Sequence, residues 1–418
     1  MRVLWFSVTT SLYNDKRNIH NGGGWIDSLE RIVVDNNQID LAVAFVENSL
    51  DIPFQKVESE YVTYYLMGLK RNLFQRLKDK FSFADIDNET LLRCMSVISD
   101  YNPDLIHIFG SEWCFGLIKE KTNIPIVIHM QGCWPTYRNA IYPPGFSKIN
   151  KYFENIFNFH KIFQQIISEK QSKYRARREE HILRINNNYM GRTRWDLALT
   201  MLYNKKSNYY YCSEALRPEI ADCKGKWNSH RVEPMEIITV GGSNTLKGYD
   251  VVLKTAFLLK ENSDLYFKWN LCGPTTQDMV DFEKKTGIKC RDVNVFPLGR
   301  CSTEQVKEYL LSSYIYVHTA YIDNSPNSVC EAQYLGLPII ATSVGGIPSL
   351  FSIEYPTDFL IPTNDPYYLA SKILQLNKDK NLLNKLSELN YKTAQNRHNK
   401  ETLYQSLMEC YKAMINLH

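Results

Sequence analysis

The sequence predicts an α/β protein made of two domains, each built around a parallel β-sheet. The chain has 418 residues, which is too long for a single hydrophobic core and favours two domains of roughly 200 residues. Residues 3–46 read as strand, glycine-rich loop, helix and strand, and residues 314–350 repeat this alternation. Strands that alternate with helices form parallel sheets, in which ligands bind at the carboxyl ends of the strands.

The stretch 314–350 carries the clearest pattern. Residues 314–319 and 338–342 are short apolar strands, and turn residues follow the first of them. Between the strands, residues 327–335 predict a helix because apolar residues recur on one face. Gly336 stands where that helix should end. The stretch is therefore one β-loop-α-β unit of a parallel sheet.

Two carboxylates lie in this unit. Asp323 follows the first strand, and Glu331 lies about two turns along, where it can face the same crevice. Asn324 or Ser325 can cap the helix, and Pro326 suits its first turn. A helix start offers N–H groups to a phosphate, and carboxylates suit sugar hydroxyls, so the unit predicts a nucleotide-sugar site. The spacing equally allows Asp323 to act only as a cap and Glu331 to lie on a solvated face.

Composition excludes several classes of protein. The formal net charge of +4 is small, whereas nucleic-acid binders usually show a concentrated basic face. The ten cysteines are scattered, with no C-x-x-C pair or metal-ligand spacing, so we expect buried thiols, no metal site and a cytoplasmic chain. The N-terminus, MRVLWFSVTT, resembles a strand rather than a signal peptide, and no apolar stretch reaches the roughly 18 residues of a membrane span.

The run DNSPNSVCEAQYLGLPIIATSVGGIP, which begins at Asp323, resembles the C-terminal signature of family 4 of the retaining glycosyltransferases, which have the GT-B fold. The first acid of that signature is usually glutamate, and Asp323 is one methylene shorter. The NSPNS loop is most similar to a subgroup found in bacterial surface-polysaccharide synthesis. The resemblance implies two Rossmann-like domains facing across a cleft. It also implies retaining, metal-independent transfer of a hexose-type sugar from a nucleotide sugar to a glycan.

By this resemblance, three side chains carry the reaction. Asp323 holds the transferred sugar, Glu331 the ribose hydroxyls, and Lys247 the leaving diphosphate. Without a metal, Lys247 and helix dipoles must neutralise that diphosphate. The full set of expected donor-binding residues is Gly23, Gly24, Gly242, Ser243, Lys247, Gly299, Arg300, Asp323, Asn324, Ser325, Pro326, Asn327, Ser328 and Glu331.

The loop 241–248 resembles the diphosphate loop of the family. That loop normally has a Gly-Arg pair followed by a Lys-Gly pair, and this chain has Gly242 at the arginine position. One of two expected cations is therefore missing. Ser243, Arg192 and Arg300 are the candidates to compensate for it.

The first domain opens with a glycine-rich loop, residues 21–24, at the start of a helix. Such a loop lets the backbone approach a ligand closely, and the resemblance implies that it faces the donor phosphates and the acceptor. The alternative is that this loop only reverses the chain direction and binds no ligand. The pattern is not G-x-G-x-x-G, so no nicotinamide cofactor is predicted. We expect no cofactor at all, with a UDP- or GDP-sugar as substrate.

Polar loops follow the predicted strands 105–109 and 125–129, and at these carboxyl ends they should face a ligand. Many family members have a histidine where this chain has Phe109 or Gln131, so no catalytic histidine is assigned. His107 alternates with apolar neighbours and is interpreted as a core residue. The expected acceptor-side residues are Glu112, Gln131, Gly132 and Arg192.

Residues 150–187 predict a helical insertion in which basic residues alternate with aromatic and aliphatic ones, from Phe153 to Arg178. Such a helix can lie on an anionic membrane surface, or it can be a solvated helix with its apolar side on the core. The run GRTRWD then resembles the same polysaccharide-related subgroup. Its Arg192 suits either a bidentate clamp on a phosphate or acidic sugar, or an ion pair with Asp196.

We expect three parts in the chain. Residues 1–214 form the acceptor-side domain, 215–396 form the nucleotide-sugar domain with a hinge at 215–234, and 397–418 form a helix that crosses back to the first domain, as the resemblance implies. The expected role is surface-polysaccharide (for example capsule) synthesis on a glycan or lipid-linked glycan. Peripheral contact with the inner membrane face stays open. The alternatives are a GT-B sugar-nucleotide epimerase and a catalytically silent sugar-nucleotide-binding protein.

Overall fold

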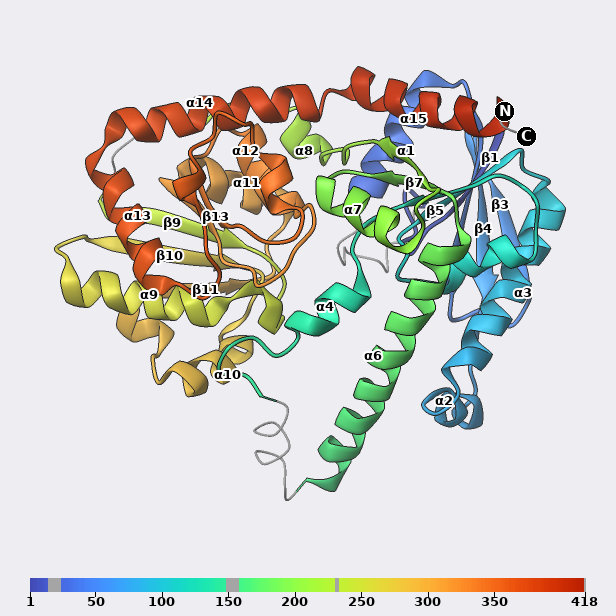
Figure 1. Cartoon of the computed structure of the whole chain (residues 1–418), viewed down its shortest axis with the longest axis horizontal. Coiled ribbons are helices and arrows are strands. Elements are labelled where there is room, and N and C mark those ends of the chain that lie inside the picture. The colour runs from blue at the N-terminus through green and yellow to red at the C-terminus, as the bar shows by residue number, and fades with distance from the viewer. Residues whose placement is uncertain (14–23, 148–157, 230–232, 417–418) are drawn as a thin grey trace. The chain divides into compact units, whose positions relative to one another are not determined.

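The computed structural model describes residues 1–13, 24–147, 158–229 and 233–416 (Figure 1). The chain divides into two compact units. Unit 1 comprises Met1–Arg138, Tyr152–Ala215 and Lys400–His418, and unit 2 comprises Asn139–Lys151 and Leu216–Asn399. The expected first domain, 1–214, is therefore not one continuous stretch. Phe146 explains the difference, because its ring packs against the unit 2 core, 5.8 Å from the ring of Phe282.

Unit 1 is built on an eight-stranded sheet with the order β3-β4-β2-β1-β5-β6-β7-β8. Its strands are β1 Arg2–Phe6, β2 Asp40–Glu47, β3 Phe54–Glu58, β4 Val62–Gly68, β5 Leu105–Phe109, β6 Ile126–His129, β7 Asn188–Gly191 and β8 Asn208–Tyr211. The pairings are parallel except between β3 and β4. From β1 the chain adds strands on one side of the sheet, and from β5 it adds them on the other, so the strand order reverses between β1 and β5.

Both faces of this sheet are covered. Along β1, Val3 and Trp5 belong to one apolar cluster, and Leu4 and Phe6 belong to the other. Successive side chains of a strand point to opposite faces of the sheet, so this alternation shows that both faces of β1 are buried. The first cluster includes side chains of α1 and α15, and the second includes side chains of α3 and α6. The helices are α1 Gly24–Asn36, α2 Leu73–Asp79, α3 Phe83–Tyr101, α4 Trp134–Ala140, α6 Phe159–Ile185, α7 Arg194–Tyr203 and α15 Lys400–Asn416, with a 3₁₀ helix η1 Cys114–Glu120.

Unit 2 is built on a six-stranded parallel sheet with the order β11-β10-β9-β12-β13-β14. Its strands are β9 Met235–Val240, β10 Phe267–Cys272, β11 Val295–Gly299, β12 Ile315–His318, β13 Ile339–Thr342 and β14 Leu360–Ile361. Strands run outward from β9 in one direction and from β12 in the other. The boundary between β9 and β12 is thus the topological switch point, where doubly wound sheets bind their ligands.

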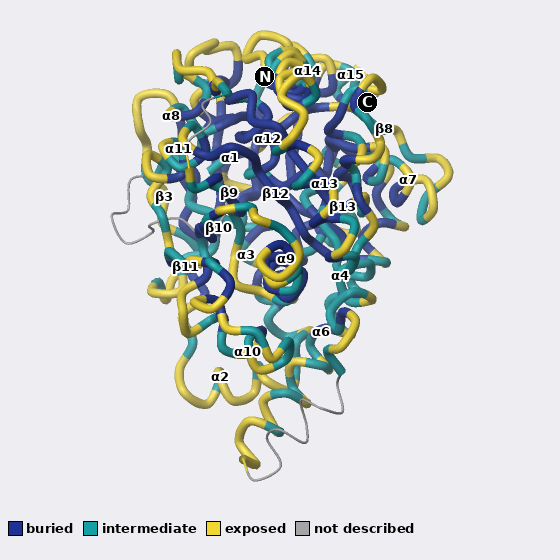
Figure 2. Tube along the Cα trace, turned by 90° about the vertical axis from the view of Figure 1, so that its left-hand side faces the viewer, coloured by how far each residue is buried: buried dark blue, intermediate teal, exposed yellow. Residues whose placement is uncertain are grey.

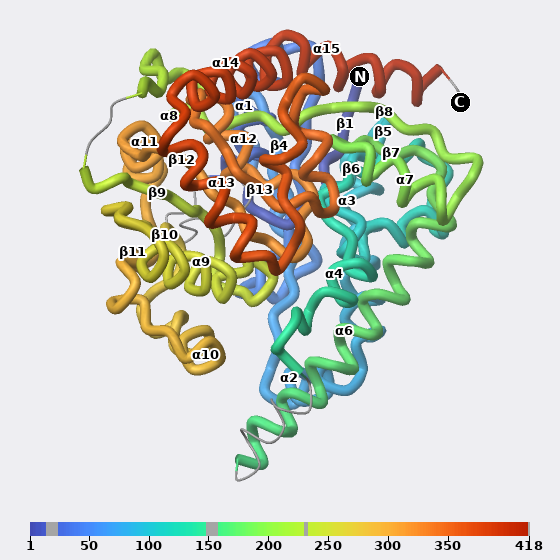
Figure 3. Tube along the Cα trace, turned by 60° about the vertical axis from the view of Figure 1, so that its left-hand side comes forward, coloured from blue at the N-terminus to red at the C-terminus, as the bar shows by residue number. Residues whose placement is uncertain are grey.

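Helices cover unit 2 in two groups. They are α8 Pro218–Ala221, α9 Tyr249–Asn262, α10 Thr276–Thr286, α11 Thr303–Ser312, α12 Asn327–Tyr334, α13 Pro366–Lys378 and α14 Lys380–Arg397, with short 3₁₀ helices η2 Thr245–Lys247, η3 Cys290–Val293, η4 Ile347–Leu350 and η5 Thr357–Phe359. Helix α9 contacts α10 and α13, which lies beside it in Figures 1 and 3, whereas α12 contacts α8 and α14. Right-handed crossovers in opposite directions place the two groups on opposite faces.

These two doubly wound sheets confirm the predicted α/β class. Buried residues gather along their strands (Figure 2). Among the described residues, no helix combines the length and the apolar character that crossing a membrane requires.

Candidate functional site

Two loops of unit 2 meet at its switch point. Residues 241–248 follow β9, and residues 319–326 follow β12, its neighbour in the sheet. The backbone joins them directly, since the amide of Tyr321 donates to the carbonyl oxygen of Leu246 at 2.7 Å. The two loops that were expected to hold the donor therefore form one structure.

Gly248 lets Lys247 reach the neighbouring loop. Its backbone is left-handed (φ 70°), and a Cβ at this position would overlap the carbonyl oxygen of Thr319. Only glycine permits that approach. The Nζ of Lys247 then lies 2.6 Å from Oδ2 of Asp323, although the two residues are 76 positions apart. The fold thus brings two of the three expected catalytic side chains into an ion pair.

Asp323 is held in its charged form. Burial raises the pKa of Asp323, but Lys247 and His318 lower it more, so the pKa is well below that of an exposed aspartate. The Nε2 of His318 lies 3.3 Å from Oδ2 of Asp323. Burial lowers the pKa of His318 despite this carboxylate, which favours the neutral imidazole. His318 was not singled out from the sequence.

Glu331 is paired with Arg217, which lies in the stretch that was predicted to be the hinge, residues 215–234. Nε and Nη2 of Arg217 donate to the two carboxylate oxygens of Glu331, each at 2.7 Å, and Nη1 donates to Oγ1 of Thr303 at 2.8 Å. Glu331 is 1% exposed, which excludes the solvated face as its location. Burial raises its pKa, while Arg217 lowers it.

The start of α12 differs from the expected cap. The helix begins at Asn327, so Pro326 is the N-cap residue, and no side chain makes a cap hydrogen bond. The prediction of a cap at Asn324 or Ser325 was wrong, because a helix that starts at Asn327 has Pro326 at its N-cap position. The amide of Asn324 instead donates to Oδ1 of Asp323 at 3.1 Å. Asp323 therefore belongs to the turn and is not a helix cap.

The other expected donor-binding residues, apart from Gly23 and Gly24, lie along one edge of unit 2. Ser328 accepts a hydrogen bond from the Tyr316 hydroxyl at 2.8 Å. Gly242 and Ser243 are exposed in the loop after β9, whereas Gly299 and Arg300 stand at the end of β11, two strands away. Of the pair in unit 1, Gly24 begins α1, and Gly23 lies outside the described residues.

The expected acceptor-side residues gather in unit 1. Glu112, Gln131 and Arg192 follow β5, β6 and β7, which are adjacent in the sheet. A Cβ on Gly110 would lie 2.7 Å from Oε2 of Glu112, and one on Gly132 would lie 2.7 Å from Oε1. The carboxylate of Glu112 thus rests against two glycines. Burial raises its pKa and the charge of Arg192 opposes the rise, so these side chains form one polar cluster.

Glu179, on α6, joins this cluster and was not found from the sequence. It accepts hydrogen bonds from Ser111 Oγ at 2.5 Å and from the amide of Trp134 at 2.7 Å, and it is fully buried. Burial, and then the charge of Glu112, raise the pKa of Glu179 to about 8. A proton is therefore held beside the acceptor-side residues at neutral pH.

Replacing Glu179 with glutamine should remove a pH dependence of stability. Between about pH 4.5 and about pH 8 the folded protein keeps a proton on Glu179 that the unfolded chain releases, so the free energy of unfolding falls as the pH rises. Urea unfolding of the natural protein across this range should show the fall, and Glu179→Gln should lack most of it. Glu180→Gln is the matched control. Equal slopes in natural protein and Glu179→Gln would show that Glu179 is ionised when folded.

Two further sequence interpretations can be compared with unit 1. His107 is a buried core residue, as predicted, with Nδ1 2.5 Å from the hydroxyl of Tyr411 on α15, and burial lowers its pKa to about 3. Asp196 accepts the backbone N–H of Arg192 at 2.9 Å and completes the capping box of α7 with Thr193. The guanidinium of Arg192 lies over the ring of Trp25, 4.8 Å from its centroid.

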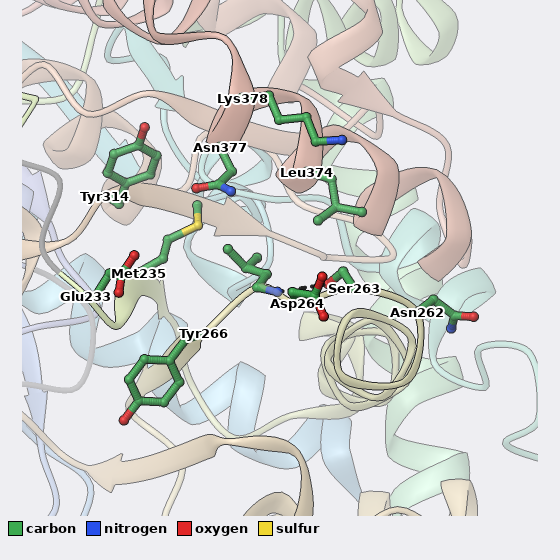
Figure 4. A pocket seen from close by; sticks show the side chains of 11 residues that line it. Glu233, Met235, Asn262, Ser263, Asp264, Tyr266, Tyr314, Leu374, Asn377 and Lys378 are labelled. Atoms are coloured by element: carbon green, nitrogen blue, oxygen red, sulfur yellow. Dashed lines mark hydrogen bonds between the residues drawn. The ribbon is translucent and has the colours of Figure 1, made fainter.

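A pocket of about 460 Å³ lies elsewhere in unit 2 (Figure 4). Its lining includes Met235, Tyr266 and Tyr314, at the amino ends of β9, β10 and β12. Parallel sheets bind ligands at the opposite edge. We therefore assign the candidate site to the charged cluster at the carboxyl edge and not to this pocket.

Two doubly wound units are what the GT-B class of fold requires, and known proteins of that fold are similar to this chain. Residues 226–393 match the family model described as Glycosyl transferases group 1. Sucrose-phosphate synthase from Thermosynechococcus elongatus aligns over 100% of both chains, with a TM-score of 0.72 and 15% identity. HepE from Anabaena, solved with UDP and glucose, aligns over 99% of this chain and 100% of its own, with a TM-score of 0.61 and 12% identity.

Two curated relatives match shorter parts of the chain. TuaC of Bacillus subtilis, described as a teichuronic acid biosynthesis glycosyltransferase, is 42% identical over 53 residues, which are 13% of this chain and 14% of TuaC. The amylovoran biosynthesis glycosyltransferase AmsK of Erwinia amylovora is 26% identical over 155 residues, 35% of this chain and 37% of AmsK. The matches thus span well under half of either relative. Each of these relatives is described as a glycosyltransferase, as is the family model that matches residues 226–393.

Proposed function

We propose that this chain is a retaining, family 4 glycosyltransferase that moves a hexose-type sugar from a UDP- or GDP-sugar to a glycan or lipid-linked glycan. The observation that carries the proposal is the cluster at the unit 2 switch point, where Lys247 pairs with Asp323 and Glu331 lies buried against Arg217. The relatives named for teichuronic acid and amylovoran biosynthesis support a role in surface-polysaccharide synthesis.

The charges of this cluster suit a nucleoside diphosphate sugar. Lys247 is the cation that opposes the leaving diphosphate when the donor enters and its ion pair with Asp323 opens. Asp323 stays ionised because its pKa is lowered, so it accepts hydrogen bonds from sugar hydroxyls. Glu331 accepts those of the ribose. Positive charge at the leaving oxygen then comes from Lys247 and backbone N–H groups, and the reaction needs no metal ion.

Unit 1 holds the acceptor in this proposal. Glu112, Gln131 and Gly132 stand at the carboxyl ends of neighbouring strands, and Arg192 lies beside Glu112. A carboxylate with an arginine next to it is suited to the hydroxyl groups of a glycan and to an acidic or phosphorylated substituent.

A panel of nucleotide sugars tests the proposal. UDP- and GDP-sugars should raise the thermal unfolding temperature, since a ligand at 100 times its dissociation constant adds about 2.7 kcal/mol to stability. The stabilising donor should release its nucleoside diphosphate, and a chelator should leave the rate unchanged. An epimerase would return an isomerised nucleotide sugar, and a silent binding protein would return the donor unaltered. Either result would contradict transfer.

The first half of α6 does not pack on the core. Phe159, Phe163 and Ile166 are 83%, 46% and 40% exposed, and the buried residues of the helix all come after Lys170. The core-packing alternative for the basic segment is therefore wrong for this half, because α6 extends beyond the sheet that its second half covers (Figures 1 and 3). The predicted start of the segment, Phe153, lies outside the described residues.

Helix α2 continues this exposed apolar surface. None of its residues is buried, and the ring of Phe81, just after α2, lies 6.0 Å from that of Phe163. We define the α2–α6 surface as the exposed side chains Leu73, Phe74, Leu77, Phe81, Phe159, Phe163 and Ile166. Exposed cations lie in or next to α2 and α6, namely Lys70, Arg76, Lys78, Lys80, Lys161 and Lys170; of these, Lys70 and Lys78 pair with Asp51 and Asp85.

We propose that the α2–α6 surface rests on an anionic membrane face, which would place the enzyme beside a lipid-linked acceptor. Apolar side chains enter the interface, and each Lys or Arg near the headgroups adds about 1 kcal/mol. The protein should co-sediment with vesicles that contain phosphatidylglycerol at low salt and less so at high salt. Phe74→Ser with Phe163→Ser should abolish this, whereas Leu202→Ser, at a residue 71% exposed on α7, should not. No retention at low salt would contradict membrane contact.

A further inference from the structure

The charge state of Glu331 depends on one neighbour. Among the described groups, Arg217 and Glu219 are the charged side chains that act on this carboxyl, and only Arg217 favours ionisation. Burial of a carboxyl raises its pKa, so removal of the arginine would raise the pKa of Glu331 further. Arginine does not lose its own proton in proteins. The pair is thus a fixed arrangement of charges.

The geometry of the pair is equally specific. The guanidinium meets Glu331 with two nitrogens, and its third nitrogen is anchored by Thr303 at the start of α11. Such a two-point contact fixes the plane of the carboxylate. Each carboxylate oxygen accepts one hydrogen bond from Arg217 and can accept another. Two oxygens with free acceptor capacity, held in a fixed plane, match two neighbouring hydroxyl groups.

We propose that Arg217 is the positioning residue that makes Glu331 a receptor for a vicinal diol, and so selects ribonucleotides over 2′-deoxyribonucleotides. This inference rests on the proposed function, in which Glu331 holds the ribose of the donor. A charged carboxylate only accepts hydrogen bonds and therefore serves both ribose hydroxyls. A protonated carboxyl has an O–H donor on one oxygen, so it accepts hydrogen bonds from the two ribose hydroxyls less well. Arg217 acts through Glu331 and need not touch the nucleotide.

The test compares nucleotide pairs by titration calorimetry. The probes are UDP and GDP with their 2′-deoxy counterparts, measured between about pH 6 and about pH 9. The measured quantity is the ratio of the two dissociation constants within a pair. This ratio cancels the titration of the phosphates, which both nucleotides share. The natural protein should prefer the ribonucleotide at least about tenfold, since one hydrogen bond to a charged group is lost, and the preference should not change with pH.

Three variants separate charge from geometry. In Arg217→Met the preference should fall towards one as the pH is lowered, because Glu331 without its arginine takes up a proton at a higher pH than in the natural protein. In Arg217→Lys the preference for the ribonucleotide should be reduced but independent of pH. The lysine keeps the positive charge, but it cannot make the two-point contact with the carboxylate. In Glu331→Gln it should be lost at every pH. Arg291→Met, at an arginine whose side chain is 78% exposed in the same unit, is the control and should behave like the natural protein.

The outcomes are distinct. A ribose preference in Arg217→Met that equals the natural protein at all pH values would overturn the role of Arg217. Equal binding of both nucleotides by the natural protein would overturn the role of Glu331 as a diol receptor. If neither UDP nor GDP bound the natural protein, the proposed function itself would fail, which is a different result from the loss of a preference.

Discussion

Replacing Lys247 with alanine should lower turnover of the nucleotide sugar at least about tenfold, a loss of roughly 1.4 kcal/mol of transition-state stabilisation. Lys247 lies 2.6 Å from Asp323 and is the cation expected to meet the leaving diphosphate, while Gly242 stands where the family that the chain resembles has a second cation. The same change removes the strongest influence that lowers the pKa of Asp323. The loss of the cation opposes departure of the diphosphate, and the higher pKa weakens the carboxylate that is expected to hold the transferred sugar.

The comparison for this variant is Lys268→Ala. Lys268 is another ion-paired lysine of unit 2, 3.8 Å from Glu236, at the start of a neighbouring strand. Initial rates at low and at saturating donor separate binding from catalysis. Near-natural rates for Lys247→Ala under both conditions would remove Lys247 from the site.

Replacing Glu331 with glutamine should also lower turnover at least about tenfold. Glutamine keeps the shape of the side chain but removes its charge and one acceptor oxygen, and it leaves the guanidinium of Arg217 without its counter-ion. Hydrogen bonds to charged groups are worth about 1.5–3 kcal/mol, so the expected loss is large.

An exposed glutamate controls for this substitution. Glu304, on α11, pairs with Lys307 and its side chain is 58% exposed, so Glu304→Gln should retain natural rates. A Glu331→Gln variant with natural kcat and natural donor KM would show that this carboxylate takes no part in donor binding or transfer.

Local pattern was sufficient to predict the fold class and the unit 2 loops. The alternation of strand and helix in 314–350 corresponds to β12, α12 and β13, because apolar periodicity and a terminating glycine act over only a few residues. Asp323 and Lys247 were found by the motifs around them, and the parallel sheet brings the ends of adjacent strands together. Neighbouring strand ends converge in any doubly wound sheet, so motif and topology together locate this cluster.

Arg217 and Glu179 could not be predicted in the same way. Arg217 lies in a polar stretch without a motif, and its partner Glu331 is 114 residues away in the chain. Glu179 is one charged residue among many in a basic helix, and its contacts with Ser111 and Trp134 come from distant loops. Such pairs depend on tertiary packing, which leaves no local pattern in the sequence.

The surface on α2 and α6 shows a second limit. The basic and aromatic composition of α6 suits both a membrane face and a packed face, and only the position of the helix separates them. The first half of α6 extends beyond the sheet, whereas Ile182 and Leu183 in its second half are buried in the core. The neighbouring α2 was not expected, since no helix or strand was predicted for the polar and aromatic residues 50–100.

The most direct test of the central claim is the fate of the anomeric carbon in a stabilising nucleotide sugar. Proton NMR of the reaction with an acceptor, or with water in its place, reports the configuration of the first product together with release of UDP or GDP. The account predicts release of the nucleoside diphosphate with the donor's configuration retained, and an at least about tenfold slower appearance of both products in Lys247→Ala and Glu331→Gln. An inverted product, or release that persists unchanged in both variants, would contradict it.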